Sequence, residues 1–181
     1  MVFGLLYKKS KRIFGKKQWI MIKDDLDWKI LEVLQQNSRT PYAVIGREIG
    51  LSASAVAERI QRLEDSGVIE GYATTINLKK AGLPLSAYIS IQVQKTNHAT
   101  FVSYIKEFPE VIQCSRVTGK DCLIMKCALK DSSHLANVID RLAVYGDPTT
   151  LVVLSEVIRN GMICKEIIEL AAALEAGDMP D

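Results

Sequence analysis

Cysteine and histidine, the residue types that most often bind metals or act as nucleophiles, are sparse in this chain. Its two histidines, His98 and His134, stand alone near expected helix starts. Its cysteines form no CxxC pair and no zinc-ligand spacing, and three of the four lie in apolar segments. They are Cys114, Cys122, Cys127 and Cys164. This pattern predicts buried free thiols in a reducing cytoplasm, with no catalytic residue, no metal site and no cofactor.

Polar residues that suit DNA recognition gather on one expected helix, LSASAVAERIQRLEDSG, which opens at Ser52 as its N-cap. An apolar residue recurs at positions 56, 60 and 63 and predicts a buried stripe. The side facing away from this stripe presents Ala53, Ser54, Ala57, Glu58 and Gln61. We expect Ser54 to bond a phosphate or a base edge, while Gln61 suits adenine and Glu58 suits cytosine.

Three arginines are candidates for contacts with DNA phosphates. Arg59 and Arg62 lie on the same expected helix, where they can reach phosphates or pair with neighbouring acids in a solvated lattice. Those acids are Glu58, Glu64 and Asp65. Arg39, between the two preceding helices, is a further candidate.

A second polar group surrounds an expected hairpin turn, TGKD at residues 118–121. Glycine allows a tight turn whose backbone amides can hold a carboxylate, and an aspartate beside it can take an ammonium group. Threonines in the turn and in a later strand add hydroxyls. The expected effector-binding set is Thr118, Gly119, Lys120, Asp121, Thr149 and Thr150. These residues fit either an amino-acid site or an ordinary hairpin with a polar turn.

Three short helices must position the DNA-reading residues. Residues 24–36 place apolar side chains on one helical face and three aspartates at the positive helix start. Thr40 and Pro41 predict the cap and first turn of a second helix, which ends at Gly50. The third helix opens at Ser52 and stops at Gly67. This order indicates a helix-turn-helix, followed by a wing or linking strand over residues 68–84.

The second half of the chain reads as a ferredoxin-like βαββαβ arrangement. Strands are expected at 85–93, 111–118, 121–129 and 149–158. Asn97 is the expected cap of a first helix, and Ser132 or Ser133 that of a second, which ends at residues 146–148. A final helix near 162–176 has four residues to bury. They are Ile163, Ile167, Ile168 and Leu170.

Charge is distributed unevenly along the chain. Residues 1–20 carry six bases and no acid, so the rest of the chain has a net charge of 2 − 6 = −4. Residues 21–82 hold eight bases and nine acids, so DNA binding must rest on local geometry. The first 20 residues fit a basic arm that contacts phosphates, a membrane-surface or targeting segment, or sequence upstream of a true start at Met21.

These observations divide the chain into five parts. The expected boundaries are 1–20 for the basic extension, 21–71 for the winged helix-turn-helix, 72–84 for the wing and linker, 85–160 for the βαββαβ domain, and 161–181 for the C-terminal helix and tail.

Several segments resemble the leucine-responsive and asparagine-activator regulators, the Lrp/AsnC family. LDWKILEVLQQNSR and IGLSASAVAERIQRLEDSGVIEGYATTIN are similar to the DNA-binding half of that family. FPEVIQCSRVTGKDCLIMKCAL and TTLVVLSEVI are similar to its C-terminal half, the RAM domain. The resemblance covers about residues 21–160 and leaves out both ends of the chain.

The resemblance implies a transcriptional regulator that binds double-stranded DNA as a homodimer, in the family often a tetramer or octamer. It also implies an amino acid or related effector near the 118–121 turn. Many effector-binding members have an aromatic residue after this turn, whereas this chain has Cys122, as in a second variant of the family. No membrane partner is expected.

Three alternatives differ in function. The first is an effector-independent DNA organiser. The second is an assembly module that has lost DNA binding, which the low charge of residues 21–82 favours. The third is a haem-pathway decarboxylase, because such enzymes resemble this architecture; two histidines without an Arg/His cluster argue against a tetrapyrrole pocket.

Overall fold

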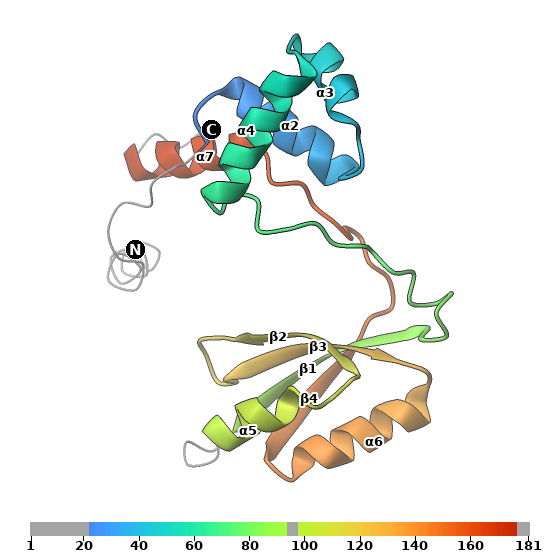
Figure 1. The fold of residues 1–181 in the computed structure, drawn as a ribbon. Helices are drawn as coiled ribbons and strands as arrows, with labels where there is room; N and C mark the ends of the chain where they lie inside the picture. Colours follow the sequence, from blue (N-terminus) through green and yellow to red (C-terminus); the bar gives the residue numbers. More distant parts are fainter. Residues whose placement is uncertain (1–21, 94–97, 177–181) are drawn as a thin grey trace. The chain divides into compact units, whose positions relative to one another are not determined.

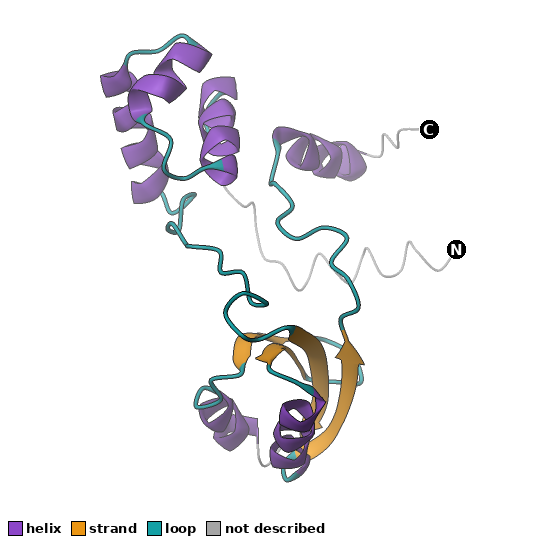
Figure 2. Cartoon of the chain, turned by 90° about the vertical axis from the view of Figure 1, so that its right-hand side faces the viewer, coloured by secondary structure: helices purple, strands orange, loops and turns teal. Residues whose placement is uncertain are grey.

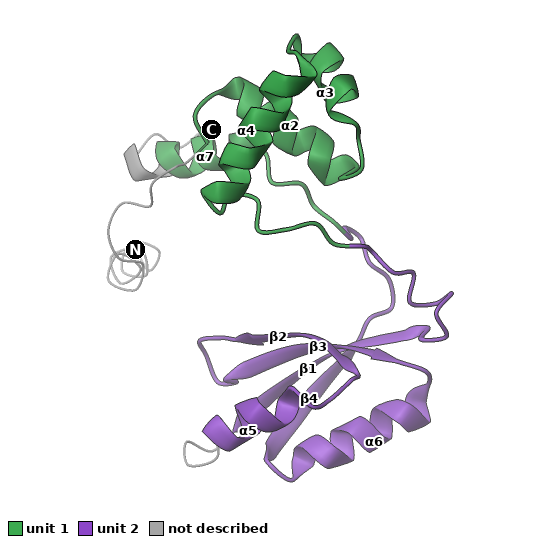
Figure 3. Ribbon diagram, in the orientation of Figure 1, with its two compact units in different colours: residues 1–73, 160–181 green, residues 74–159 purple. Residues whose placement is uncertain are grey.

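The computed structural model describes residues 22–93 and 98–176. The chain forms two compact units, coloured separately in Figure 3. Unit 1 joins residues 1–73 with the C-terminal residues 160–181, and unit 2 comprises residues 74–159. The C-terminal segment, which the sequence sets apart, thus belongs to the helical unit. Within the described ranges, no helix has the length and apolar character needed to cross a membrane.

Unit 1 contains the expected three helices, α2 (Asp25–Gln36), α3 (Tyr42–Ile49) and α4 (Ala53–Asp65) (Figure 1). Asp24 caps α2 and Ser52 caps α4, each through a side-chain oxygen that accepts from a backbone N–H three residues later. Apolar residues from all three helices form one core. Its fully buried or nearly buried members are Ile30, Leu34, Ile45, Val56, Ile60 and Leu63.

One expectation about α3 is wrong, and one of its residues has a role that the sequence did not suggest. Thr40 is not its cap: the helix starts after Pro41 without a side-chain cap, and the Thr40 hydroxyl donates to the Asn37 carbonyl at 2.8 Å. Gly46, not noticed in the sequence, is buried in α3 where it meets the following turn. A Cβ at this position would collide with the carbonyl oxygen of Leu51, so the turn is as tight as it is because Gly46 lacks a side chain.

Unit 2 is a four-stranded antiparallel sheet in the order β2-β3-β1-β4, with two helices on one face, as Figures 1 and 2 show. The strands are β1 (Leu85–Val93), β2 (Val111–Arg116), β3 (Leu123–Leu129) and β4 (Gly146–Val152). The helices are α5 (His98–Ile105) and α6 (Ser132–Ala143). The expected alternation in β1 is confirmed, because residues 87, 89, 91 and 93 are buried under α5 and α6.

Boundaries in unit 2 differ from the sequence expectation. Residues 146–148 do not end a helix; they start β4, where Pro148 lies opposite Ile91. The strand therefore ends at Val152, six residues earlier than expected. Asp131, not Ser132 or Ser133, caps α6 by accepting from the His134 N–H at 2.8 Å. Asn97 lies outside the described residues.

The segment expected to form a wing is irregular. Residues 70–77 have no strand or helix, and a turn follows at 78–82. The Asn77 side-chain oxygen accepts from the Lys80 N–H at 3.1 Å, which stabilises that turn. The predicted linker is present, but no wing strand pairs within the described part of this segment.

The cysteine prediction is wrong in part. Cys127 is buried in the unit 2 core, where burial raises its pKa to about 11. Cys122 and Cys164 are half-buried and Cys114 is exposed. Across the described segments, no group of three or more His, Cys, Asp or Glu side chains is placed to hold a metal ion.

Candidate nucleic-acid interface and effector turn

The N-terminal turn of α4 presents short polar side chains to solvent. Ala53, Ser54, Glu58 and Gln61 are exposed as expected, whereas Ala57 is half-buried. The hydroxyls of Ser52 and Ser54 lie 3.0 Å apart, so Ser54 is held beside the cap. These residues form a low surface without bulky side chains, which lets a helix approach base edges closely.

Further along α4, hydrogen bonding limits what the polar residues can read. The Gln61 amide donates to Asp65 at 2.9 Å, one helical turn away. A contact from Gln61 to adenine would require breaking this exposed bond, which contributes little to stability.

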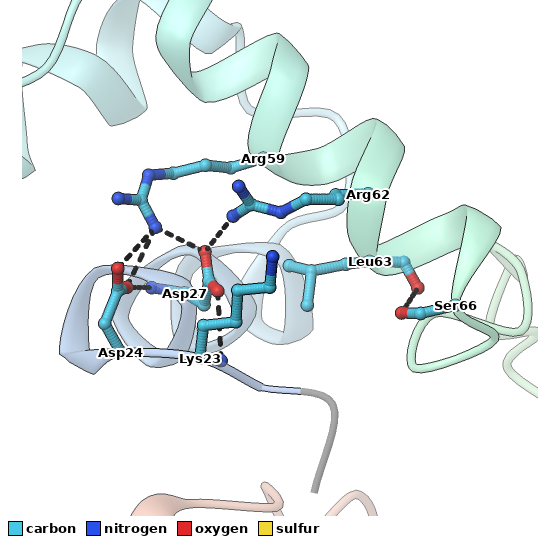
Figure 4. Close-up of polar contacts among 7 residues, drawn as sticks. All are labelled: Lys23, Asp24, Asp27, Arg59, Arg62, Leu63 and Ser66. Carbon is cyan, nitrogen blue, oxygen red and sulfur yellow. Dashed lines mark hydrogen bonds and ion pairs between the residues drawn. The ribbon is translucent and has the colours of Figure 1, made fainter.

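The arginines of α4 have partners that the sequence analysis missed (Figure 4). Arg59 Nη1 lies 2.8 Å from Asp24 Oδ1 and 2.7 Å from Asp27 Oδ1. Arg62 Nη2 lies 3.3 Å from the same Asp27 oxygen. Asp27 is buried, with 1% of its side chain exposed, and its second oxygen accepts from the Lys23 N–H at 3.2 Å. The expected lattice with Glu58, Glu64 and Asp65 is not what the structure shows for these two arginines.

The network of Asp24, Asp27, Arg59 and Arg62 fixes α4 against α2. Its formal charges cancel, so it adds no net positive field to the surface. A backbone N–H of Asp27 and the guanidinium of Arg59 lower the pKa of Asp24, and Asp27 with Asp24 raises the pKa of Arg59. The sequence does carry the signal: aspartates three apart on α2 face arginines three apart on α4. Only the fold shows that these pairs meet.

Other candidate phosphate contacts lie on α2, on α3 and in the loop between these helices. Arg39 is exposed in the loop between α2 and α3, and its backbone N–H donates to the Asn37 side chain at 3.0 Å. Lys29 on α2 and Arg47 on α3 are also exposed. Unit 1 therefore carries accessible cations on α2, on α3 and in the loop between them; Arg39 was expected from the sequence, whereas Lys29 and Arg47 were not.

The expected effector set divides between the two faces of the sheet. Asp121 Oδ2 accepts from the Ser90 hydroxyl at 2.7 Å, and Thr149 lies opposite Ser90 in the β1–β4 ladder. Opposed residues point to the same side of a sheet, so Asp121, Ser90 and Thr149 share the face that the helices leave open. Thr150 lies opposite Ile89 and points toward the helices, where its hydroxyl is buried and has no hydrogen-bond partner among the described residues. Thr150 therefore does not join the turn residues.

The turn itself is exposed and glycine-dependent. Thr118, Gly119 and Lys120 are exposed, and Gly119 has φ +141°, a conformation that side chains disfavour. Cys122 then secures the turn to β1: its backbone N–H and its thiol both donate to the Ile91 carbonyl, at 3.2 and 3.4 Å. The turn therefore projects from a fixed base, with Asp121 and Ser90 at its foot.

The chain matches the family models of two domains. The AsnC-type helix-turn-helix domain matches residues 24–64, and the Lrp/AsnC ligand binding domain matches residues 86–163. These ranges contain nearly all of α2 to α4 and of the sheet, and they leave out residues 1–23, 65–85 and 164–181.

Known regulators are similar over most of their length. LrpC of Bacillus subtilis strain 168 is 32% identical over 139 residues, which are 76% of this chain and 96% of LrpC. FL11 of Pyrococcus furiosus is 34% identical over 119 residues, covering 66% of this chain and 79% of FL11. Both are HTH-type transcriptional regulators.

Solved structures agree with this result. The structure of B. subtilis LrpC matches with a TM-score of 0.72 at 32% identity, covering 75% of this chain and 97% of LrpC. A transcriptional regulator from Neisseria meningitidis, solved as a complex with L-Met, matches with a TM-score of 0.76 at 26% identity, covering 81% and 99%. Because both domains match in order and LrpC is covered almost end to end, this chain belongs to the Lrp/AsnC family of DNA-binding transcriptional regulators.

Proposed function

We propose that the protein controls transcription as a homodimer, alone or within a tetramer or octamer, whose paired α4 helices enter the major groove of double-stranded DNA. The observation that carries this proposal is the exposed N-terminal turn of α4, where Ser52 and Ser54 stand on a helix fixed by buried ion pairs. Arg39, exposed in the loop between α2 and α3, is a candidate phosphate contact. A fixed, sterically open helix start is what major-groove recognition needs.

Binding of double-stranded DNA from the protein's own promoter region, measured by fluorescence anisotropy, tests this interface. Ser54→Glu places a carboxylate against the phosphates, so we expect at least a tenfold loss of affinity. Ser133→Glu is the matched control, because it too is the second residue of a capped helix and is exposed. Equal affinities of the two variants would show that α4 does not read DNA, as in an assembly module without DNA binding.

The same proposal includes an amino-acid effector at the foot of the 118–121 turn. The support is local: Asp121 with Ser90 offers a carboxylate for an ammonium group, and the exposed turn has backbone amides for a carboxylate. The Neisseria relative was solved with L-Met, an amino acid with both groups. An effector acts only through its difference in affinity between assembly states.

A thermal-stability screen of the amino acids tests this part. The effective amino acid should raise the melting temperature of the wild type but not that of Asp121→Asn. Asp140→Asn, at an exposed position on α6, is the control, and its melting temperature should rise as in the wild type. If no amino acid stabilises the wild type, the protein is an effector-independent DNA organiser.

A further inference from the structure

The C-terminal helix α7 (Lys165–Ala176) leaves an apolar face uncovered on unit 1. The sequence predicts that Ile163, Ile167 and Leu170 are buried, but they are 58%, 47% and 49% exposed, and Met162 before them is 42% exposed. Ile167 and Leu170 lie three residues apart on α7, so they form an apolar stripe on one face of the helix, and Met162 and Ile163 lie in the segment just before it. A contiguous apolar stripe of this kind marks a contact surface.

Polar contacts hold α7 to α2 and leave that stripe free. The Gln35 amide donates to the Ile163 carbonyl at 2.9 Å and accepts from the Ile163 N–H at 2.8 Å. Lys165 Nζ lies 2.8 Å from Asp25 Oδ1, and this contact, followed by Glu169, raises the pKa of Lys165. The segment just before α7 is therefore tied to the last turn of α2, and the first residue of α7 is tied to the first turn of α2.

This tie places α7 where the N-terminal segment enters the unit. Residues 1–20 join α2 through Ile22, which packs against the helical core three residues before Asp25. α7 is about 18 Å long, and a few extended residues of the N-terminal segment suffice to follow it. The segment needs no long connection to reach the stripe.

The charge and composition of residues 1–20 also suit them to bind the apolar stripe of α7. Residues 1–20 have six bases and no acid, and they carry apolar residues between the basic clusters. Residues 166–181 carry five acids and no base. These acids are Glu166, Glu169, Glu175, Asp178 and Asp181. An amphipathic basic segment is complementary to an apolar helix face with acidic flanks.

We propose that the apolar face of α7 is the docking site of residues 1–20 of the same chain. Docking would pair the basic clusters with Glu166 and Glu169, which are exposed on α7, and withdraw those clusters from DNA phosphates. This consequence for DNA rests on the proposed function, whereas the docking does not. The C-terminal helix would then set how much of the basic segment is available to DNA.

Trp19 provides a direct test, because the chain has only two tryptophans and the other, Trp28, is buried in α2. In full-length Trp28→Phe, Trp19 emission should be blue-shifted and protected from acrylamide relative to the urea-unfolded chain. Ile167→Ser with Leu170→Ser should remove that protection and raise the quenching constant severalfold. Val144→Ser is the matched control, since Val144 is an exposed apolar residue of unit 2.

Four results would overturn the proposal. Trp19 quenched equally in the folded and unfolded chains would mean that the segment docks nowhere. Protection that survives the double substitution would place it elsewhere, and protection lost on dilution would place it on a second copy. If the double substitution lowers helicity, Glu166→Gln with Glu169→Gln replaces it, and Trp19 protection unchanged by that pair would also refute docking. No DNA is present, so this outcome is independent of the proposed function.

Discussion

At the residue scale, a buried carboxylate decides how the recognition helix is held. Asp27 is almost fully buried and receives two guanidinium groups and a backbone N–H. A buried charge is tolerated only when it is paired and hydrogen-bonded, so each partner depends on the others. The arginines that the sequence offered as phosphate contacts therefore have a structural role in this fold.

Asp27→Asn should destabilise unit 1 by about 3 kcal/mol, because it leaves Arg59 and Arg62 without their shared partner. Urea unfolding measures this loss. Glu32→Gln, on the same helix, is a control that should change stability by less than about 0.5 kcal/mol. Equal stabilities of both variants would mean that the network contributes nothing, and that the arginines remain available to phosphates.

Glu110 in unit 2 is also a partly buried, paired carboxylate, and it should make the stability of that unit depend on pH. Burial favours a higher pKa for Glu110, but hydrogen bonds, first from its own backbone and then from His134 and Arg141, lower the pKa below its usual 4.5. A lowered pKa stabilises the fold above pH 4.5, and this contribution is lost as the pH falls through the folded-state pKa. The free energy of unfolding of the wild type should exceed that of Glu110→Gln by about 1–3 kcal/mol at pH 7, and this difference should shrink below pH 4.5. A gap that is constant in pH, measured by chemical unfolding, would contradict this assignment.

At the element scale, the tightest constraint lies between α3 and α4. The Leu51 N–H donates to the Gly46 carbonyl at 2.8 Å, and Gly50 takes φ +76°, so the chain reverses direction in very few residues. Helix propensity alone favours Ala over Gly within α3 by about 1 kcal/mol. The contact with the Leu51 backbone opposes this preference, and backbone atoms cannot move aside as a flexible side chain does.

Gly46→Ala should therefore destabilise unit 1 by about 1–3 kcal/mol despite its gain in propensity. The displaced turn should also lower DNA affinity, because it moves Ser52 and Ser54. Thermal unfolding and DNA titration measure both effects, and Glu48→Ala on the exposed side of α3 controls for propensity. A more stable Gly46→Ala protein would mean that the turn relaxes freely.

Elements with strong periodicity were predictable from sequence, and contacts between elements were not. The alternation in β1 and the apolar stripes of α2 and α4 gave these elements and most of their buried residues. The start of β4 was misplaced because Gly, Asp and Pro usually end helices and strands. Pro148 nevertheless fits in β4, because β4 is an edge strand and the N–H that proline lacks is not needed for a ladder hydrogen bond there. The Asp27 network and the separation of Thr150 from Thr149 depend on pairings that only the fold defines.

At the scale of the whole molecule, the proposed function relies on assembly to offset the weak charge of the DNA-binding unit. Unit 1, residues 1–73 with 160–181, carries 13 bases against 14 acids, so a single copy has little general attraction for DNA. Unit 2 meanwhile exposes Tyr88, Ile124 and Leu151 on the open face of its sheet. The segment after β4 adds Leu154 and Val157, each more than 90% exposed. These residues form an apolar surface of the kind that obligate dimers cover.

Leu151→Asp should therefore impair assembly and DNA binding together. A charge on this face disrupts an interface of about 2,000 Å², so sedimentation at micromolar concentration should shift from dimer to monomer. Each copy then binds one half-site alone, and the loss of linked binding should weaken affinity by about 10²–10⁴. Val144→Asp, equally apolar and exposed but on the turn after α6, should change neither measurement. A dimer that survives Leu151→Asp would place the interface elsewhere. A monomer with unchanged DNA affinity would show that unit 1 binds without the help of a second copy, which its charge does not favour.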